Sequence, residues 1–284
     1  MPELPEVETI RRQLERLIVG RTISSIEVFN PGSFRADQDS LIGRTITVVG
    51  RKGKVLIVGP DNLYIHLKMS GQLEFIDKTI SNISKKARPF PKRPGLPRAK
   101  HLRVVITFID GSCLLFHDQR KFGWITDDPA VLPKGIDALD SKLTVKKLEE
   151  ILQSSNRPIK TILLDQSKIA GIGNIYASEI LWEAKINPAN PASKGLAFRA
   201  QGETLIKAIR EILYEAIRFG GSTMGDGLYQ HVGGESGSYW SRRRVYDRGG
   251  QPCRRPACRK IGAVIRKTAI AHRSTYWCPN CQAG

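Results

Sequence analysis

The residue types from which chemistry can be argued most directly stand at the start of the chain, as Met1, Pro2 and Glu3. Removal of Met1 would leave a secondary amine at the N-terminus with a carboxylate beside it. A terminal α-amine has a pKa near ~8, so about a tenth of it is unprotonated at neutral pH. Such a nitrogen can attack the anomeric carbon of a sugar, displace the attached base and form a Schiff base. Pro2 could therefore act as a nucleophile and Glu3 could transfer protons; the alternative is that Pro2 merely starts the chain.

Four of the five cysteines lie close together near the end of the chain. Their spacing is Cys-x4-Cys, nineteen residues, then Cys-x2-Cys. Two close pairs across a hairpin-sized gap bring four thiolates within reach of one tetrahedral Zn²⁺. A reduced, metal-free tail is the alternative. We expect one structural zinc ion, bound by Cys253, Cys258, Cys278 and Cys281, and a core role for Cys113 in its apolar stretch.

The composition favours a polyanionic partner. The 284 residues include 45 Lys plus Arg against 27 Asp plus Glu, a net charge of +18. Such a charge favours nucleic acid through counterion release, with an anionic membrane surface as the rival. No run of 18 apolar residues is present and the first residues lack a hydrophobic signal segment, so the sequence supports neither a membrane span nor secretion. We expect a cytoplasmic protein with no membrane partner.

The first half of the chain reads as one helix followed by strands. Pro5 suits the first turn of a helix, which would be its structural role, and the helix should end at Gly20. Short β-rich runs separated by turn signals then continue to residue 118, a spacing typical of a β-sandwich. Residues 77–100 interrupt them with four prolines and eight basic residues. A loop of this length is functional or mobile, and we expect mobility with a weak electrostatic contribution to nucleic-acid binding.

The second half is helical. Turn residues at 127–140 mark the change, and Thr144 is a plausible N-cap of the first helix that follows. Helical patterns cover residues 143–153, 158–165, 174–184 and about 200–219. A glycine-rich segment follows at about 221–238, and the cysteine-bearing tail ends the chain. We predict an α+β protein with domains at 1–130, 131–240 and 241–284.

Three long motifs carry a family resemblance: MPELPEVE at 1–8, GIGNIYASE at 171–179 and STYWCPNCQ at 274–282. With them the chain resembles, essentially from end to end, the bacterial formamidopyrimidine-DNA glycosylases, which remove oxidised purines from DNA. The resemblance implies an N-terminal β-sandwich carrying the N-terminal helix, then a helical domain with a helix-two-turns-helix element and a β-hairpin zinc finger. It also implies a monomeric, cytoplasmic and nucleoid-associated protein whose partner is damaged double-stranded DNA.

The resemblance assigns catalytic roles to five positions. It makes Pro2 the nucleophile, Glu3 the general acid/base and Glu6 a carboxylate that supports the pocket. Lys54 matches a catalytic-site lysine that contacts phosphates beside the damaged nucleotide. Arg273 matches the finger arginine that contacts phosphates at the lesion. By composition alone, both basic residues would read as solvated surface charges.

A second group of positions belongs to the DNA-binding surface of the family. An enzyme that acts on a base must extrude it, and the vacated stack needs apolar or flat side chains. The resemblance assigns that wedge to Met69 and Phe122, which would otherwise be packing residues. It pairs Arg120, whose fork offers two parallel donors, with the orphaned base. His66 begins the same turn motif as Met69 and is expected to contact DNA.

The remaining expected contacts lie in the second half. GIGNIYASE places Asn174 at a glycine-flanked helix N-terminus, which attracts phosphate. Lys160 matches a lysine near the lesion. The glycine-rich segment corresponds to a loop that closes over the everted purine, with a plain linker as the alternative. The tail departs from the family, whose usual first cysteine pair is Cys-x2-Cys, so the first knuckle must bulge around residues 254–257.

The resemblance implies a bifunctional enzyme without a redox or nucleotide cofactor. It excises 8-oxoguanine and formamidopyrimidines through a Schiff base on Pro2, and β,δ-elimination then cuts the strand. One rival is an endonuclease VIII-like glycosylase for oxidised pyrimidines, whose N-terminus typically lacks the Leu4-Pro5 pairing. The other rival is a damaged-DNA-binding protein without catalysis.

Overall fold

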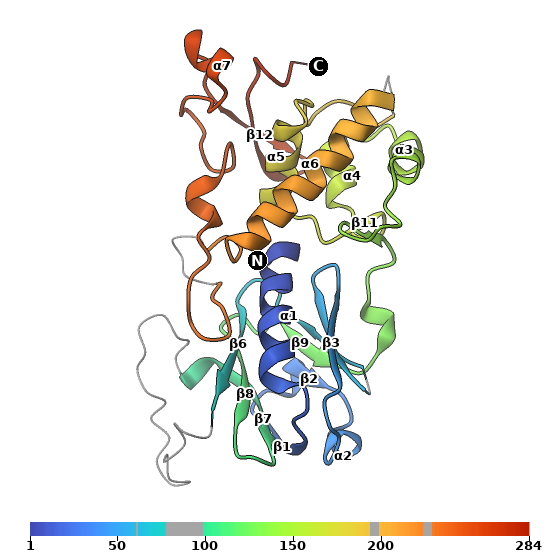
Figure 1. The fold of residues 1–284 in the computed structure, drawn as a ribbon, viewed down its shortest axis with the longest axis vertical. Coiled ribbons are helices and arrows are strands. Elements are labelled where there is room, and N and C mark those ends of the chain that lie inside the picture. Colours follow the sequence, from blue (N-terminus) through green and yellow to red (C-terminus); the bar gives the residue numbers. More distant parts are fainter. Residues whose placement is uncertain (61, 78–98, 194–198, 224–228, 284) are drawn as a thin grey trace. The chain divides into compact units, whose positions relative to one another are not determined.

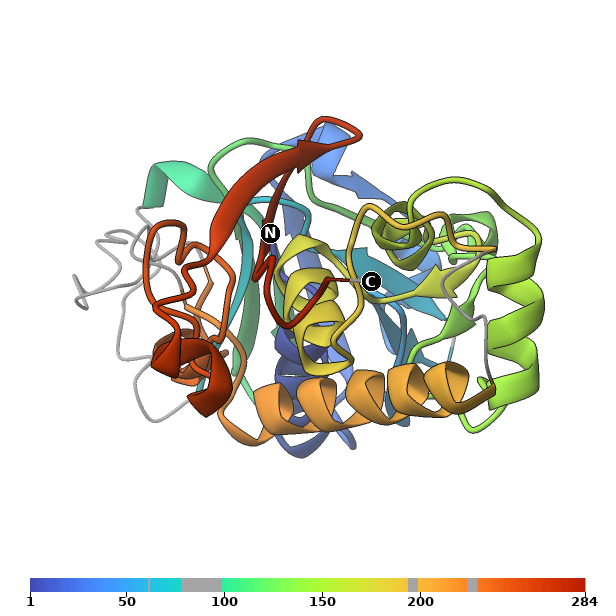
Figure 2. The same cartoon turned by 90° about the horizontal axis from the view of Figure 1, so that it is seen from above.

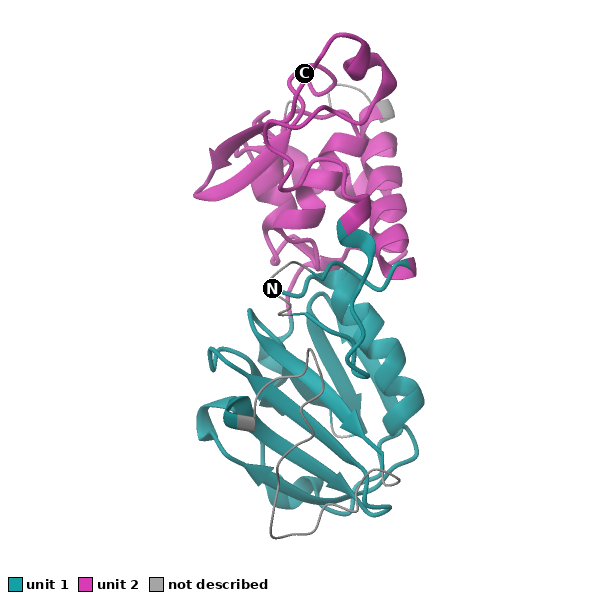
Figure 3. Ribbon diagram, turned by 90° about the vertical axis from the view of Figure 1, so that its left-hand side faces the viewer, with its two compact units in different colours: residues 1–132, 219–240 teal, residues 133–218, 241–284 magenta. Residues whose placement is uncertain are grey.

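The computed structural model describes residues 1–60, 62–77, 99–193, 199–223 and 229–283. These residues form two compact units (Figure 3). The first unit consists of residues 1–132 and 219–240, and the second of residues 133–218 and 241–284. Most of the proline-rich segment and five residues of the glycine-rich segment lie outside the described residues.

Helix α1 (Leu4–Ile18) opens the first unit, with Glu3 as its N-cap residue and Pro5 in its first turn. Proline fits there because the first backbone N–H groups of a helix have no partner within it. The apolar face of the helix, which repeats every three to four residues, is buried. That face consists of Leu4, Val7, Ile10, Leu14 and Ile18. The N-terminal helix expected from the sequence is confirmed (Figure 1).

Two sheets follow and confirm the β-sandwich. The four-stranded sheet has the order β1 (Ile23–Val28), β7 (Leu102–Phe108), β8 (Cys113–Asp118) and β6 (Gly71–Ile76). The five-stranded sheet has the order β2 (Phe34–Arg35), β9 (Trp124–Thr126), β5 (Leu63–His66), β4 (Val55–Gly59) and β3 (Val48–Lys52). Neighbouring strands are antiparallel except β2 and β9, which are parallel. The short helix α2 (Gln38–Leu41) lies between β2 and β3 in the chain.

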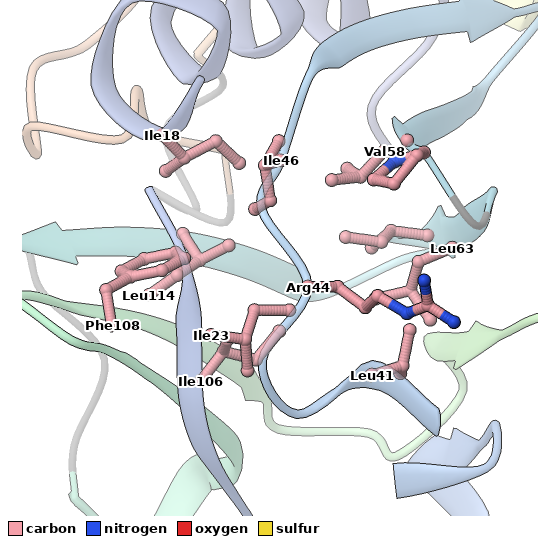
Figure 4. A pocket seen from close by; sticks show the side chains of 13 residues that line it. Ile18, Ile23, Leu41, Arg44, Ile46, Val58, Leu63, Ile106, Phe108 and Leu114 are labelled. Atoms are coloured by element: carbon pink, nitrogen blue, oxygen red, sulfur yellow. The ribbon is translucent and has the colours of Figure 1, made fainter. Parts of the chain in front are cut away.

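The core of this unit joins α1 to both sheets in one hydrophobic cluster. Ile10 and Leu14 of the helix pack with Leu56 and Phe116 from the two sheets. A small cavity of about 20 Å³ remains inside the sandwich, between side chains such as Ile18 and Leu114 (Figure 4). Arg44 also lines this cavity, and the other side chains around it are apolar.

Residues 219–240 return to the first unit, whereas the sequence division had grouped them with the helical domain. Backbone hydrogen bonds hold them there. The N–H of Val232 donates to Oε1 of Gln13 on α1 at 3.0 Å. The carbonyl of Val232 accepts from the N–H of Phe75 on β6 at 3.3 Å. These partners lie more than 150 residues away in the chain, so no local pattern in the sequence predicts the contacts.

The second unit is mainly helical. Its helices are α3 (Val145–Gln153), α4 (Ile159–Leu164), α5 (Asn174–Glu183), α6 (Arg199–Arg218) and α7 (Pro256–Lys260). A short parallel pair, β10 (Ile136–Asp137) and β11 (Ile169–Ala170), and the hairpin of β12 (Arg266–Ile270) and β13 (Arg273–Trp277) complete it. Thr144 caps α3 as expected, because its hydroxyl accepts from the N–H of Lys147 at 3.2 Å.

Helix α5 is the centre of this unit. Its side chains are buried from Ile175 to Trp182, as expected of a helix covered on all sides. It lies between α6 and β13, which Figure 2 shows with α5 in yellow and α6 in orange. Within the described part of the chain, no helix has the length and apolar character needed to span a membrane.

We predict that Phe108→Ala lowers the free energy of unfolding of the first unit by about 3–5 kcal/mol. The side chain is 1% exposed in the sandwich core, so truncation removes buried apolar surface and leaves a cavity. The next residue provides a matched control, because Ile109 is 70% exposed and its replacement by alanine should change stability by less than about 0.5 kcal/mol. Urea unfolding of both variants tests this; equal effects would contradict the assigned core.

Candidate active site and metal centre

The N-terminal residues are held by the carboxylate of Glu6. Its Oε2 accepts from the backbone N–H of Glu3 at 2.9 Å, and its Oε1 accepts from the backbone N–H of Ser222 at 2.7 Å. Glu3 and Glu6 are 3% and 2% exposed. Pro2 is also buried, and its nitrogen is bonded to Met1, so only loss of Met1 would turn it into an amine. One carboxylate thus connects the residue after Pro2 to the beginning of the glycine-rich segment.

The two ends of the glycine-rich segment, residues 220–223 and 229–237, are hydrogen-bonded to each other and form a narrow neck. The hydroxyl of Thr223 accepts from the N–H of Gly237 at 2.8 Å and donates to the carbonyl of Tyr229 at 3.0 Å. A Cβ atom on Gly237 would collide with the carbonyl oxygens of Gly220 and Gly221, so the neck requires glycine. Residues 224–228 lie outside the described residues.

Tyr229 fixes the same neck to α1. Its hydroxyl donates to the carbonyl of Gly220 at 2.9 Å and lies 3.4 Å from the carbonyl of Glu6. Burial and the nearby charge of Glu6 raise the pKa of Tyr229 well above its ordinary value. The phenol therefore stays protonated and continues to donate at any pH at which the protein works.

Lys54, His66 and Lys68 lie where the beginning of strand β4 pairs with the end of strand β5. Lys54 stands in the two-residue turn between β3 and β4, and Val55 beside it pairs with His66. Nδ1 of His66 accepts from the N–H of Lys68 at 2.9 Å. Burial, with the charges of Lys68 and Lys54, lowers the pKa of His66 to about 3. His66 is therefore neutral, and because Nδ1 accepts, Nε2 carries the proton.

Met69 and Phe122 are apolar side chains that the structure leaves exposed. Their exposed fractions are 37% and 53%, although each follows a buried strand. The guanidinium of Arg120 lies over the ring of Phe122, with 4.7 Å from its carbon to the ring centre. An exposed methionine beside an exposed aromatic and arginine suits contact with a flat ligand.

Asp118, which is fully buried, joins the loops that carry these side chains. Its Oδ1 accepts from the hydroxyl of Ser70 at 2.5 Å and from the N–H of Arg120 at 3.1 Å. Its Oδ2 accepts from the N–H of Gly123 at 2.6 Å. The hydroxyl of Ser70 also accepts from the N–H of Arg120 at 3.0 Å. This network brings the loop of Met69 and the loop of Arg120 and Phe122 together.

In the second unit, Lys160 and Asn174 converge on the hairpin. Nζ of Lys160 donates to the carbonyl of Ser274 at 3.0 Å and to the hydroxyl of Thr275 at 2.8 Å. Nδ2 of Asn174 donates to the same carbonyl at 3.0 Å. Lys160 is fully buried. Both side chains hold the beginning of β13 in this structure, and their contact with DNA stays a prediction.

Arg273 directly follows the tip of the hairpin and is exposed. The tip has two residues, Ala271 and His272, with φ of 46° and 59°. Positive φ at both central residues defines the hairpin turn that matches the twist of the strands. Arg273 therefore projects from a strand whose next residue is fixed by Lys160 and Asn174.

The four cysteines of the tail come together as the spacing predicted. The sulfur atoms of Cys253, Cys258, Cys278 and Cys281 all lie within 4.8 Å of one another. The sulfur atoms of Cys253 and Cys281 are 4.0 Å apart, and those of Cys258 and Cys278 are 3.8 Å apart. A tetrahedral Zn²⁺ with Zn–S bonds of about 2.3 Å separates its sulfurs by about this distance. The residues present therefore fit one metal ion.

Sequence reasoning missed several residues that position the site. Ser70 directly follows Met69, and Asp118 lies two residues before Arg120; a carboxylate at the end of an apolar strand was the signal available. Ser222 and Ser274 act through backbone groups, which any residue carries. No side-chain pattern could have identified these two.

The comparisons with known proteins agree with this geometry. The family model for the formamidopyrimidine-DNA glycosylase N-terminal domain matches residues 1–125, and the model for the formamidopyrimidine-DNA glycosylase H2TH domain matches residues 134–227. Formamidopyrimidine-DNA glycosylase of Enterococcus faecalis is 36% identical over 299 residues, covering 99% of this chain and 97% of that protein. The enzyme of Acidothermus cellulolyticus is 39% identical over 300 residues, with the same coverage.

Solved structures give the same answer. The MutM (Fpg) protein from Thermus thermophilus has a TM-score of 0.81 and 34% identity, covering 99% of each chain. Wild-type Lactococcus lactis Fpg (MutM), in complex with DNA that contains N7-benzyl-Fapy-dG, has a TM-score of 0.81 and 35% identity over the whole of both chains. These matches define the class of the protein as a DNA repair glycosylase. The chain belongs to the formamidopyrimidine-DNA glycosylase family.

We predict that His66 does not titrate between pH 5 and 8, since its pKa is lowered to about 3. Long-range ¹H–¹⁵N NMR spectra of the imidazole should show one neutral ring with the proton on Nε2 throughout this range. His66→Gln identifies the signal. A ring that gains a proton near pH 6.5 would contradict the buried, lysine-flanked environment.

Proposed function

We propose that this enzyme excises oxidised purines, such as 8-oxoguanine and formamidopyrimidines, from duplex DNA and then cleaves the strand as a lyase. The observation that carries the proposal is the carboxylate of Glu6. It fixes the backbone directly behind Pro2 and, through Ser222, the neck of the glycine-rich segment. An N-terminal nucleophile needs such an anchor, because chain termini are otherwise mobile.

The chemistry begins once Met1 has been removed. The nitrogen lone pair of Pro2 attacks C1′ of the everted nucleotide and the bond from C1′ to the base breaks. The base leaves with the proton that the attacking nitrogen releases. Glu3 donates a proton to O4′ as the sugar ring opens, which leaves an iminium ion on Pro2. The iminium acidifies C2′, so loss of a C2′ proton expels the 3′ phosphate. A second elimination expels the 5′ phosphate.

Extrusion of the base is assigned to the surface built on Asp118. Met69 and Phe122 fill the vacated stack, and Arg120 donates two parallel hydrogen bonds to the orphaned base. Their exposure and their shared support by one carboxylate favour this role. The expected closure of the glycine-rich segment over the purine falls partly on residues 224–228, which lie outside the described residues.

Phosphates are bound by groups from both units. Lys54, neutral His66 and Lys68 offer donors on the first unit. On the second unit, we propose that Arg273 contacts a phosphate and that Asn174 and Lys160 are neighbouring DNA-binding residues. We also propose a monomer in the cytoplasm, associated with the nucleoid. Its catalytic, helical and finger modules follow the divisions 1–130, 131–240 and 241–284, except that residues 219–240 pack with the catalytic module.

The metal of the cysteine cluster is proposed to be one zinc ion. Four thiolates at tetrahedral separations form a closed donor set with no open position, which is typical of structural zinc. When bound, the ion cross-links the two cysteine pairs and stabilises the fold of the tail. Its position in the tail gives it no part in the chemistry at Pro2.

We predict that Pro2→Gly retains damage-specific binding but loses most base excision, at least about 100-fold. Glycine removes the secondary amine and the ring that fixes its direction. Borohydride trapping on an 8-oxoguanine duplex measures the covalent intermediate, with intact mass confirming that Met1 is absent.

The same assay on thymine glycol separates the oxidised-pyrimidine alternative, and absence of trapping by processed wild-type protein would support a non-catalytic binder. Unchanged turnover of Pro2→Gly would overturn the nucleophile assignment.

We predict that Arg273→Ala weakens DNA binding and lowers the log–log salt slope by about one unit, because one phosphate contact is lost. Arg266→Ala is the matched control, since Arg266 is an exposed arginine at the other end of the same hairpin. Titrations at several salt concentrations measure both slopes. An identical slope for wild type and Arg273→Ala would argue against the phosphate contact.

A further inference from the structure

The lengthened first knuckle places Arg255 against the end of helix α5. Nη2 of Arg255 donates to the carbonyls of Trp182 and Glu183 at 2.8 and 3.0 Å. These carbonyls belong to the last turn of the helix, where a positive charge is favoured, and that of Trp182 also accepts from the backbone N–H of Lys185 at 3.1 Å. The guanidinium carbon also lies 4.1 Å from the centre of the Trp182 ring. Residues 254–257 therefore supply the cap of α5.

Trp182 in turn contacts the metal-binding residues. Its indole Nε1–H donates to Sγ of Cys253 at 3.4 Å, and the side chain is 5% exposed. A buried indole N–H requires a partner, and the thiolate supplies one. Cys258 has a similar donor, since Nδ2 of Asn280 lies 3.2 Å from its Sγ. Hydrogen bonds to ligand sulfurs orient the ligands and reduce their tendency to leave the metal.

We propose that Trp182 and Arg255 form a positioning pair that retains the metal and aligns the finger with helix α5. The indole fixes Cys253 by its N–H, and Arg255 fixes the indole by stacking and by capping the helix. The first residue of this helix, Asn174, holds the carbonyl of Ser274 beside Arg273. One helix thus carries the metal centre at its end and the proposed phosphate contact at its beginning. The inference rests on the zinc site proposed above.

The first test measures metal release. Purified holoprotein is mixed with excess chelator, and zinc loss is followed by a colorimetric dye. Trp182→Phe keeps the aromatic packing and the stack with Arg255 but removes the N–H donor, so zinc should leave about tenfold faster. Trp240→Phe, the same change in the first unit, should match wild type. Equal release rates for wild type and Trp182→Phe would overturn the proposal.

The second test reads the sulfur directly. In cobalt-substituted protein, the thiolate-to-cobalt charge-transfer band depends on hydrogen bonds to the sulfur. Trp182→Phe should shift this band relative to wild type, whereas a side chain that only packs would leave it unchanged. An identical spectrum would overturn the donor role. The band can be measured for any variant that binds cobalt.

A double-mutant cycle tests the pairing. Arg255→Met keeps an unbranched side chain over the ring but loses the capping charge, and zinc release should again accelerate. In the double variant Trp182→Phe/Arg255→Met the two effects should be less than multiplicative, because both act on one contact. Multiplicative effects would overturn the coupling. Wild-type protein that binds no zinc would overturn the metal assignment itself, whereas stoichiometric zinc with unchanged release in the variants would overturn only this inference.

Discussion

The first unit depends on a buried negative charge that must find hydrogen-bond donors. An unpaired carboxylate in a protein interior costs several kcal/mol, and Glu6 meets the requirement with two backbone N–H groups, from Glu3 and Ser222. These groups are 219 positions apart in numbering. The same requirement therefore places the start of the chain and the neck of the glycine-rich segment against one another.

The second unit uses a similar arrangement, in which two donors share one backbone acceptor. The carbonyl of Ser274 accepts from both Lys160 and Asn174. Because two donors fix one peptide group, the strand that follows Arg273 has little freedom at that point. Asp118 plays the corresponding part in the first unit, where one carboxylate receives donors from two loops. In both units, exposed functional side chains are attached to backbone that is fixed by buried polar groups.

Local patterns predicted the elements well. The period of Val7, Ile10 and Leu14 gave α1, and the cysteine spacing gave the cluster that the structure brings together. Thr144 caps its helix as its type and position indicated. These features depend on residues near one another in sequence, where periodicity and side-chain chemistry carry the information.

Long-range partners could not be predicted in the same way. Nothing in the sequence around Lys160 shows that its ammonium group is directed at Ser274, and burial of that lysine is set by a hairpin more than a hundred residues later. The return of residues 219–240 to the first unit likewise depends on bonds to Gln13 and Phe75. The resemblance identified which residues matter, but only the fold shows which of them support others.

The turn at the tip of the hairpin has a consequence for the stability of the finger. Ala271 and His272 both adopt left-handed backbone angles, at roughly 1–2 kcal/mol for each residue, where asparagine and glycine would do so at less expense. The tip is accordingly under tension, while the far end of the hairpin leads into the thiolate cluster. Asparagine and glycine at these two positions would therefore remove most of this strain, while the hairpin keeps the same turn and the same connection to the metal-binding end.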